Sequence, residues 1–144
     1  MLNEAELSKL RTDYKGEEFK TGGCYVHQIS DTVCRYYFFY KNGIRLELVD
    51  AVKIDSVNQF DLRGTKNSRG PWAIFSVDKN TITSTTWDMN EVSTFFITSV
   101  DTKKDYFKIE NDSTISTIYT DNKIVYYHFQ KFEPKPDSIN RFIK

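Results

Sequence analysis

The chain has 144 residues, a length typical of one domain built around one hydrophobic core. Its 20 Lys and Arg residues balance its 20 Asp and Glu residues, and no basic block stands out, so we expect no nucleic-acid partner. Aromatic residues make up 15% of the chain, which favours β-strands because rings fit a half-buried pleated surface.

The two ends of the chain leave its compartment open. No stretch of about 20 apolar residues could cross a bilayer as a helix, so we expect no transmembrane segment. Residues 1–11 lack the apolar core of a signal peptide. Either the protein is cytoplasmic and Met1 is native, or a leader has been removed.

A short helix is predicted over residues 3–11. Asn3 can cap its first turn, and Glu6 stands where the reciprocal half of a capping box belongs. Leu7 and Leu10 give this helix a narrow apolar stripe that could close one end of a barrel or sandwich. Residues 1–20 therefore form the helix and a polar linker that precede the β domain.

Alternating polarity begins at Cys24 and predicts paired strands over residues 24–29 and 33–41. With a turn near residues 31–32, Cys34 lies opposite Ile29 and Cys24 opposite Phe39. The two cysteines are then about five residue steps, or roughly 17 Å, apart along the ladder. A disulfide needs Cα atoms within about 7 Å, so we predict two free, buried thiols.

The clearest local signal is Asn42-Gly43 between two alternating segments. This pair predicts a two-residue type I′ turn, in which both residues have positive φ. That turn fixes the register of the hairpin and with it the face on which each side chain lies. The uniformly apolar face, expected to be core, carries Tyr37, Phe39, Leu46 and Leu48, and the opposite face carries Phe38, Tyr40, Arg45 and Glu47.

The second half of the chain continues the β pattern. A short helix is predicted over 55–62 and a flexible loop over 64–70. The predicted strands cover residues 72–77, 81–87, 91–100, 106–110, 114–120 and 123–132. Residues 133–144 form an extended, proline-containing tail, and Phe142 and Ile143 could dock it onto the body. The fold predicted for residues 1–144 is one mainly all-β domain, an antiparallel barrel or sandwich of about eight strands.

Catalytic signatures are missing from the sequence. His27 and His128 have no second histidine at metal-ligand spacing, and there is no glycine-rich phosphate loop or nucleophile elbow. An activated thiolate at Cys34, beside Arg35, is conceivable, but a small core residue is the simpler interpretation. We therefore predict no catalytic residue, no metal and no cofactor, and a protein that is not an enzyme.

Aromatic residues on the predicted strands could line a cavity for one small apolar molecule. Trp72 and Trp87 lie on one hairpin, across residues 78–80. If that hairpin closes at Val77 and Thr81, the two indoles point to opposite faces and only one is interior. The candidate lining residues are Tyr37, Phe39, Trp72, Trp87, Tyr127 and Phe129.

Several segments together resemble small, mostly uncharacterised lipocalin-like proteins of Bacteroidetes, many of them lipoproteins. The resemblance covers roughly residues 20–144, and the segments that carry it are 36–43 (YYFFYKNG), 70–72 (GPW), Ile82, Trp87, 127–132 (YHFQKF) and 134–138 (PKPDS). The GPW segment is also similar to the Gly-x-Trp of lipocalins, which lies on their first strand and here lies midway along the chain. The resemblance implies a lipocalin-like barrel and a processed lipoprotein of the cell envelope.

Two functions follow as hypotheses. The first is a non-enzymatic barrel that binds a small apolar ligand in an aromatic-lined cavity. The alternative is a protein-interaction module that uses exposed rings such as Phe38 and Tyr40, or the C-terminal tail, to contact a partner of unknown identity. A hollow interior would favour the first hypothesis, and a filled core with an exposed apolar patch would favour the second.

Overall fold

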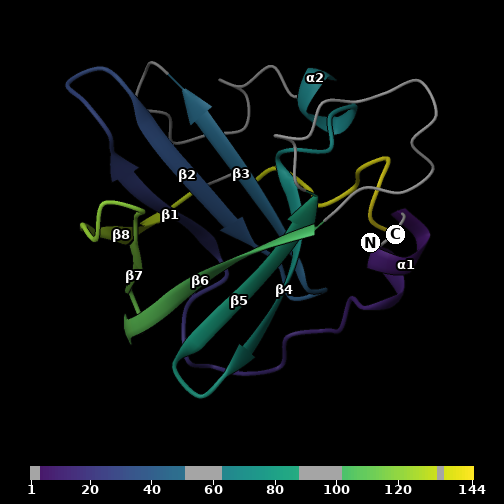
Figure 1. Ribbon diagram of the computed structural model, residues 1–144, viewed down its shortest axis with the longest axis horizontal. Helices are drawn as coiled ribbons and strands as arrows, with labels where there is room; N and C mark the ends of the chain where they lie inside the picture. Colours follow the sequence, from purple (N-terminus) through teal and green to yellow (C-terminus); the bar gives the residue numbers. More distant parts are fainter. Residues whose placement is uncertain (1–3, 51–62, 88–101, 133–134) are drawn as a thin grey trace.

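A computed structural model describes residues 4–50, 63–87, 102–132 and 135–144, and these residues form a closed antiparallel β-barrel (Figure 1). The strands follow one another around the barrel in chain order, and the last pairs back with the first. The prediction of an all-β fold with about eight strands is confirmed. The strands are β1 (Gly23–Gln28), β2 (Cys34–Phe39), β3 (Ile44–Asp50), β4 (Trp72–Asp78), β5 (Thr81–Trp87), β6 (Thr102–Asn111), β7 (Thr114–Ile118) and β8 (Ile124–Lys131).

The described residues include two short helices, α1 (Glu4–Lys9) and α2 (Arg63–Lys66). Helix α1 confirms the predicted N-terminal helix. Helix α2 begins just after the helix predicted over 55–62 and lies partly in what the sequence suggested was a loop. The predicted helix over 55–62 and the predicted strand over 91–100 lie outside the described residues.

The hairpin at Asn42-Gly43 closes one residue away from the prediction. Tyr40 N donates to Ile44 O at 2.9 Å and Gly43 N donates to Tyr40 O at 3.0 Å, so the loop has three residues. Gly43 has a φ of +86°, whereas Asn42 has no positive φ, which is the geometry of a three-residue loop with a glycine bulge. The predicted type I′ turn is therefore wrong.

This shift of one residue exchanges the two faces of the hairpin. Phe38 lies opposite Leu46 and Phe39 lies opposite Arg45. Because successive side chains in a strand point to opposite faces, the predicted core face is also wrong. Tyr37 and Phe39 share their face with Arg45 and Glu47, while Tyr36, Phe38, Leu46 and Leu48 share the other.

Other hairpins show the same shift. Gln28, not Ile29, lies opposite Cys34, and Asp78, not Val77, lies opposite Thr81. Cys34 is thus four residue steps from the position opposite Cys24, about 13 Å along the ladder. Both cysteines are buried and free, so the prediction of no disulfide is confirmed.

The buried side chains form two clusters, one on each surface of the barrel wall. Tyr37 of β2 and Phe107 of β6 have ring centroids 5.1 Å apart although their strands are not neighbours, which places them inside the barrel. The inner cluster consists of Phe19, Tyr25, Tyr37, Phe39, Phe75, Ile82, Phe107, Ile109, Ile115, Val125 and Tyr127. The outer cluster consists of Leu7, Cys24, Cys34, Tyr36, Phe38, Ile44, Leu46, Leu48, Trp72, Ile74, Trp87, Phe132, Phe142 and Ile143.

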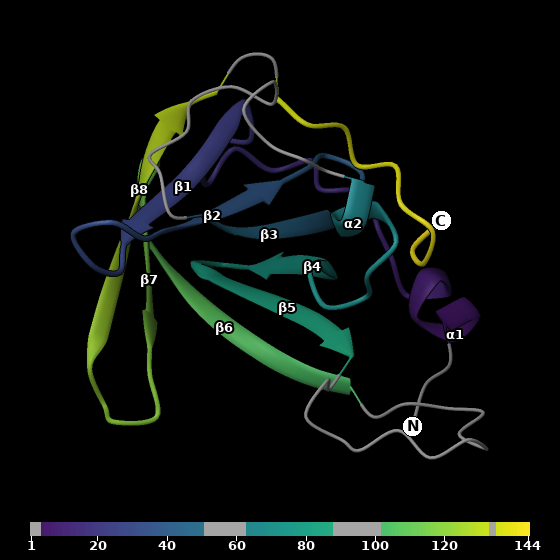
Figure 2. The ribbon, with the colours of Figure 1, turned by 90° about the horizontal axis from the view of Figure 1, so that it is seen from above.

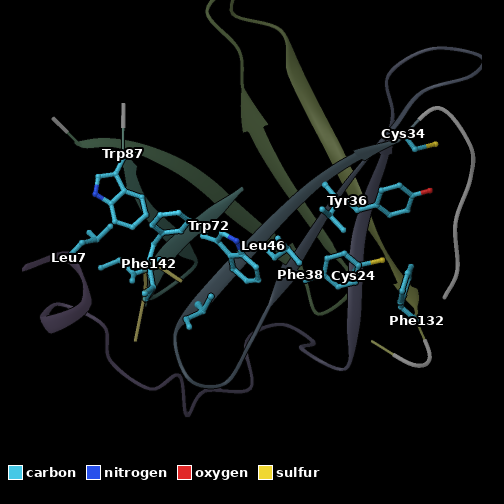
Figure 3. Close-up of a cluster of buried hydrophobic side chains, with 14 residues drawn as sticks. Leu7, Cys24, Cys34, Tyr36, Phe38, Leu46, Trp72, Trp87, Phe132 and Phe142 are labelled. Carbon is cyan, nitrogen blue, oxygen red and sulfur yellow. The ribbon is translucent and has the colours of Figure 1, made fainter. Parts of the chain in front are cut away.

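Helix α1 and the C-terminal tail cover part of the outer cluster, on the side of the barrel away from the β7–β8 hairpin (Figure 2). Leu7 and Phe142 approach Trp87 at one end of the cluster (Figure 3), where the rings of Trp87 and Phe142 lie 6.1 Å apart. Ser8 Oγ donates to Phe142 O at 3.2 Å and ties the helix to the tail. Burial of Phe142 and Ile143 fixes the predicted extended tail on the barrel.

The tail also occupies the surface on which exposed rings were predicted. Phe38 is fully buried in the outer cluster. Tyr40 donates its hydroxyl proton to Pro136 O at 2.7 Å, and Lys135 Nζ lies 4.2 Å from the centroid of the Tyr40 ring. The prediction that Phe38 and Tyr40 form an exposed contact surface is therefore wrong, because the chain itself covers them.

Candidate functional site: the open end of the barrel

One end of the barrel interior is filled with rings. Phe19, from the segment that precedes β1, packs its ring 5.2 Å from Phe39, and Phe39 packs 5.1 Å from Phe75. Tyr14 N donates to Lys41 O at 2.8 Å and holds the same segment against the β2–β3 loop. These edge-on ring contacts close this end of the barrel.

The other end is hollow. An open cavity of about 470 Å³ lies between the β2–β3 side of the barrel and the β6–β7 side. Tyr37 and Phe107, which belong to the inner cluster, form its apolar wall. The remaining lining residues are mostly polar or charged: Arg35, Glu47, Lys103, Asp105, Thr117, Ile118, Tyr119, Thr120 and Asp121.

An arginine is buried beside this cavity. The side chain of Arg45 is fully buried, and its guanidinium lies 5.1 Å from the centroid of the Tyr37 ring. Its Nη2 is 3.7 Å from Glu47 Oε2, and its Nη1 is 3.8 Å from Asp105 Oδ2. Glu47 and Asp105 both line the cavity, so Arg45 pairs with the two carboxylates from outside the cavity lining.

A second arginine lines the cavity directly. Arg35 Nη1 donates to Tyr119 Oη at 2.7 Å, and Arg35 Nε lies 3.3 Å from Glu47 Oε1. The latter pair is close enough for charge attraction but is misaligned for a hydrogen bond. Glu47 is therefore shared between the two arginines.

The donors of these arginines are incompletely used. Within the described part of the chain, no nitrogen of the Arg45 guanidinium donates a hydrogen bond, and neither does Arg35 Nε. Buried donors without acceptors cost free energy, roughly 1–3 kcal/mol each and more for charged groups. The cluster is held together by charge rather than by a completed hydrogen-bond network.

Two tyrosines and a histidine of this region are uncharged near neutral pH. Burial raises the pKa of Tyr37 and that of Tyr127, so both phenols keep their protons. Tyr127 Oη lies 3.1 Å from Tyr119 Oη. Burial also lowers the pKa of His27, whose ring is 5.4 Å from Tyr127, and this favours the neutral imidazole.

The predicted lining residues divide between the two surfaces of the wall. Tyr37 lines the cavity, while Phe39 and Tyr127 belong to the packed inner cluster. Phe129 packs against that cluster with its ring 5.6 Å from Tyr25. Trp72 and Trp87 belong together to the outer cluster, so the expectation that one indole is interior is wrong.

The register of the β4–β5 hairpin explains the position of the tryptophans. The hairpin turns through the two residues Lys79 and Asn80, and Ile74 lies opposite Thr85. Continued by two residues, this register sets Trp72 opposite Trp87, on one face. Thr86 Oγ1 donates to Trp72 O at 2.6 Å, and Trp72 Nε1 donates to Thr65 O at 2.9 Å.

Sequence reasoning missed the charged cluster. Arg45 and Glu47 alternate on β3 as Arg-x-Glu, and the predicted register turned them to the outside of the sheet. The signal that could have located them is the alternation of charged and aromatic residues on β2, where Arg35 and Tyr37 share one face. In the observed register Tyr37 pairs with Glu47, so the charged residues of the two strands lie on that same face. Asp105 precedes the predicted strand over 106–110, but β6 begins at Thr102 and includes Asp105, which pairs with Arg45.

A second hollow, of about 880 Å³, lies along the β6–β7 side of the barrel. It shares Asp105, Phe107, Thr117 and Ile118 with the first, so both belong to the same part of the wall. Large apolar side chains are exposed here, with exposed fractions of 47% to 66%, and they are Tyr106, Ile118, Ile124 and Tyr126.

Comparisons with known proteins add no relative. No protein-family model matches the chain, and no curated protein or solved structure is significantly similar to it. Among the described residues, no group of three or more His, Cys, Asp or Glu side chains could hold a metal ion. The helices that the structure describes are too short or too polar to cross a membrane.

Proposed function

We propose that this barrel binds one small molecule, with an apolar body, in the cavity at its open end. The observation that carries the proposal is a hollow of about 470 Å³ at one end of an interior that is otherwise packed with rings. Cavities of roughly 300–1,000 Å³ are typical of small-molecule sites. The rings of Tyr37 and Phe107 offer the apolar surface.

The architecture supports the same proposal. Eight antiparallel strands joined in chain order form an up-and-down barrel, the arrangement in which lipocalins hold a single ligand. The resemblance to lipocalin-like proteins of Bacteroidetes, and the envelope location that it implies, belong to this proposal. We propose binding without catalysis because Glu47 and Asp105 are engaged in ion pairs with the arginines, which suits orientation of a ligand better than proton transfer.

A neutral fluorescent probe, N-phenyl-1-naphthylamine, tests the proposal directly. Its emission should rise saturably when the purified protein is titrated. Thr117→Phe places a ring in the cavity and should weaken binding at least tenfold, since Thr117 lines it. Thr114→Phe is the control, because Thr114 lies on the same strand but does not line the cavity. A flat titration of the unmodified protein, or equal binding by both variants, would count against the proposal.

A protein-interaction function is the second candidate. It is favoured by the exposed side chains on the β6–β8 side, above all Tyr106 and Ile118, because exposed apolar patches commonly mark interaction surfaces. The simplest partner is a second copy of the chain. Sedimentation at rising protein concentration should then show association that Ile118→Lys abolishes, and a monomer at every concentration would remove this partner.

A further inference from the structure

We infer that the ligand's polar end is net neutral and carries both a hydrogen-bond acceptor and a donor, as a carboxamide does. This inference rests on the proposed function and specifies the class of molecule that the cavity takes. It follows from the charges around the cavity, from the hydrogen-bonding groups that remain open to a ligand, and from the apolar wall beside them.

The charges at the site cancel. Arg35 and Arg45 stand against Glu47 and Asp105, two positive groups against two negative groups, with 3.3–3.8 Å between the charged atoms of each pair. At the rim, Lys103 and Asp121 add one charge of each sign. Tyr37, Tyr127 and His27 add no charge, for the reasons given above. The cavity therefore presents no excess of either sign.

A singly charged ligand gains little from such a site. Moving an ion out of water is unfavourable, and an opposite charge that has no partner of its own is needed at the site to offset this cost. Each arginine already has a carboxylate within 4 Å, so an entering anion would meet Glu47 and Asp105 as well. An entering cation would meet Arg35 and the field of Arg45 in the same way.

A neutral polar group can use the hydrogen-bonding capacity that remains on the charged residues of the cavity. Arg35 lines the cavity and keeps 26% of its side chain exposed, so a carbonyl oxygen can accept a hydrogen bond from the exposed part of its guanidinium. The carboxylate of Asp105, across the cavity, makes a long ion pair at 3.8 Å and can accept a proton donor from the ligand. Phe107 lines the same cavity and offers its ring to the apolar body. A carboxamide on an apolar body therefore suits the donor, the acceptor and the apolar wall together.

Calorimetric titration with three ligands of one body tests the inference. The ligands are 3-phenylpropionamide, 3-phenylpropionate and 3-phenylpropylamine, which are neutral, negative and positive at pH 7. The amide should bind at least tenfold more tightly than either charged ligand. Binding of the anion or the cation that equals or exceeds binding of the amide overturns the inference.

Charge variants make the test sharper. Asp105→Asn keeps the shape of the site and leaves it with one excess positive charge, so the anion should gain at least tenfold relative to the amide. Lys103→Met, at the exposed rim, leaves one excess negative charge and should favour the amine, by about threefold because solvent screens it. Asp78→Asn is the control, because Asp78 is exposed and outside the cavity. An order of affinities that none of these variants changes overturns the inference.

The outcomes separate this inference from the proposed function. If N-phenyl-1-naphthylamine binds but the amide has no advantage over the charged ligands, the inference fails and the binding function stands. If neither the probe nor the amide binds, the binding function fails, and the inference fails with it.

Discussion

Replacing Gly43 by alanine should destabilise the barrel strongly, because this glycine is constrained in two independent ways. Its φ is +86°, a conformation that costs a residue with a Cβ roughly 1–2 kcal/mol. A Cβ at this position would overlap the carbonyl oxygen of Thr12 and lie 3.1 Å from its carbonyl carbon. Because these atoms belong to the backbone, the segment that closes the packed end would have to move.

The two contributions can be added approximately. Overpacking of this kind costs roughly 1–3 kcal/mol, so the total loss should be about 2–5 kcal/mol. Domains of this size have a free energy of unfolding of roughly 5–15 kcal/mol, so the variant should still fold. The melting temperature should fall by about 6–15 °C, at roughly 3 °C per kcal/mol.

Urea denaturation followed by circular dichroism measures the loss. Gly22→Ala is the matched control, since no heavy atom lies within 4 Å of the added Cβ and Gly22 has no positive φ. The control should change the free energy of unfolding by less than about 1 kcal/mol. If Gly43→Ala and Gly22→Ala are equally stable, the three-residue loop and its contact with Thr12 are both refuted.

Three further predictions concern stability and thiol chemistry. Thiol titration of unfolded, unreduced protein should count two groups, and the native protein should react slowly because burial raises the pKa of Cys24 to about 12; a count of zero would contradict this. Burial lowers the pKa of Lys135 from 10.5 to about 8, so the native state loses this proton first as pH rises and becomes more stable relative to the unfolded state. The unfolding free energy of the unmodified protein should therefore rise by about 1 kcal/mol relative to that of Lys135→Met between pH 7 and pH 9, and no relative change would refute this explanation. Lys79→Gly should raise the free energy of unfolding by up to about 1 kcal/mol because Lys79 has a φ of +56°, and a loss of stability in the same denaturation assay would contradict that reason.

The order and approximate bounds of the strands could be predicted because their signals are local. Thr81–Trp87 agrees with the predicted range 81–87, and Trp72–Asp78 differs from the prediction by one residue. Alternating polarity and turn residues are sufficient for this level of description. The start of β6 was missed because Thr102–Asp105 is a charged segment, which becomes a strand only by pairing with β5.

The registers could not be predicted in the same way. Asn42-Gly43 fits both a two-residue loop and a three-residue loop, and each places Gly43 at positive φ. Long-range contacts accompany the observed choice, including the hydrogen bond from Asn42 Nδ2 to Ser138 Oγ at 2.8 Å. No pattern within the hairpin contains this information.

An error of one residue in register had a direct effect on the predicted site. It turned Arg45 and Glu47 outward, although they lie beside the interior cavity, and it separated two tryptophans that share the outer cluster. It also concealed that both faces of β2 are buried, one by the barrel interior and one by α1 and the tail. A strand that carries aromatic residues on both faces has no polar face from which its register could be inferred.

Intermolecular nuclear Overhauser effects between bound N-phenyl-1-naphthylamine and the protein test the central claim most directly. The account predicts contacts from the probe to the ring protons of Tyr37 and Phe107 and to the methyl group of Thr117, and none to Trp72 or Trp87 of the outer cluster. Contacts confined to the exposed side chains Tyr106, Ile124 and Tyr126 would place the probe on the outer surface and contradict it.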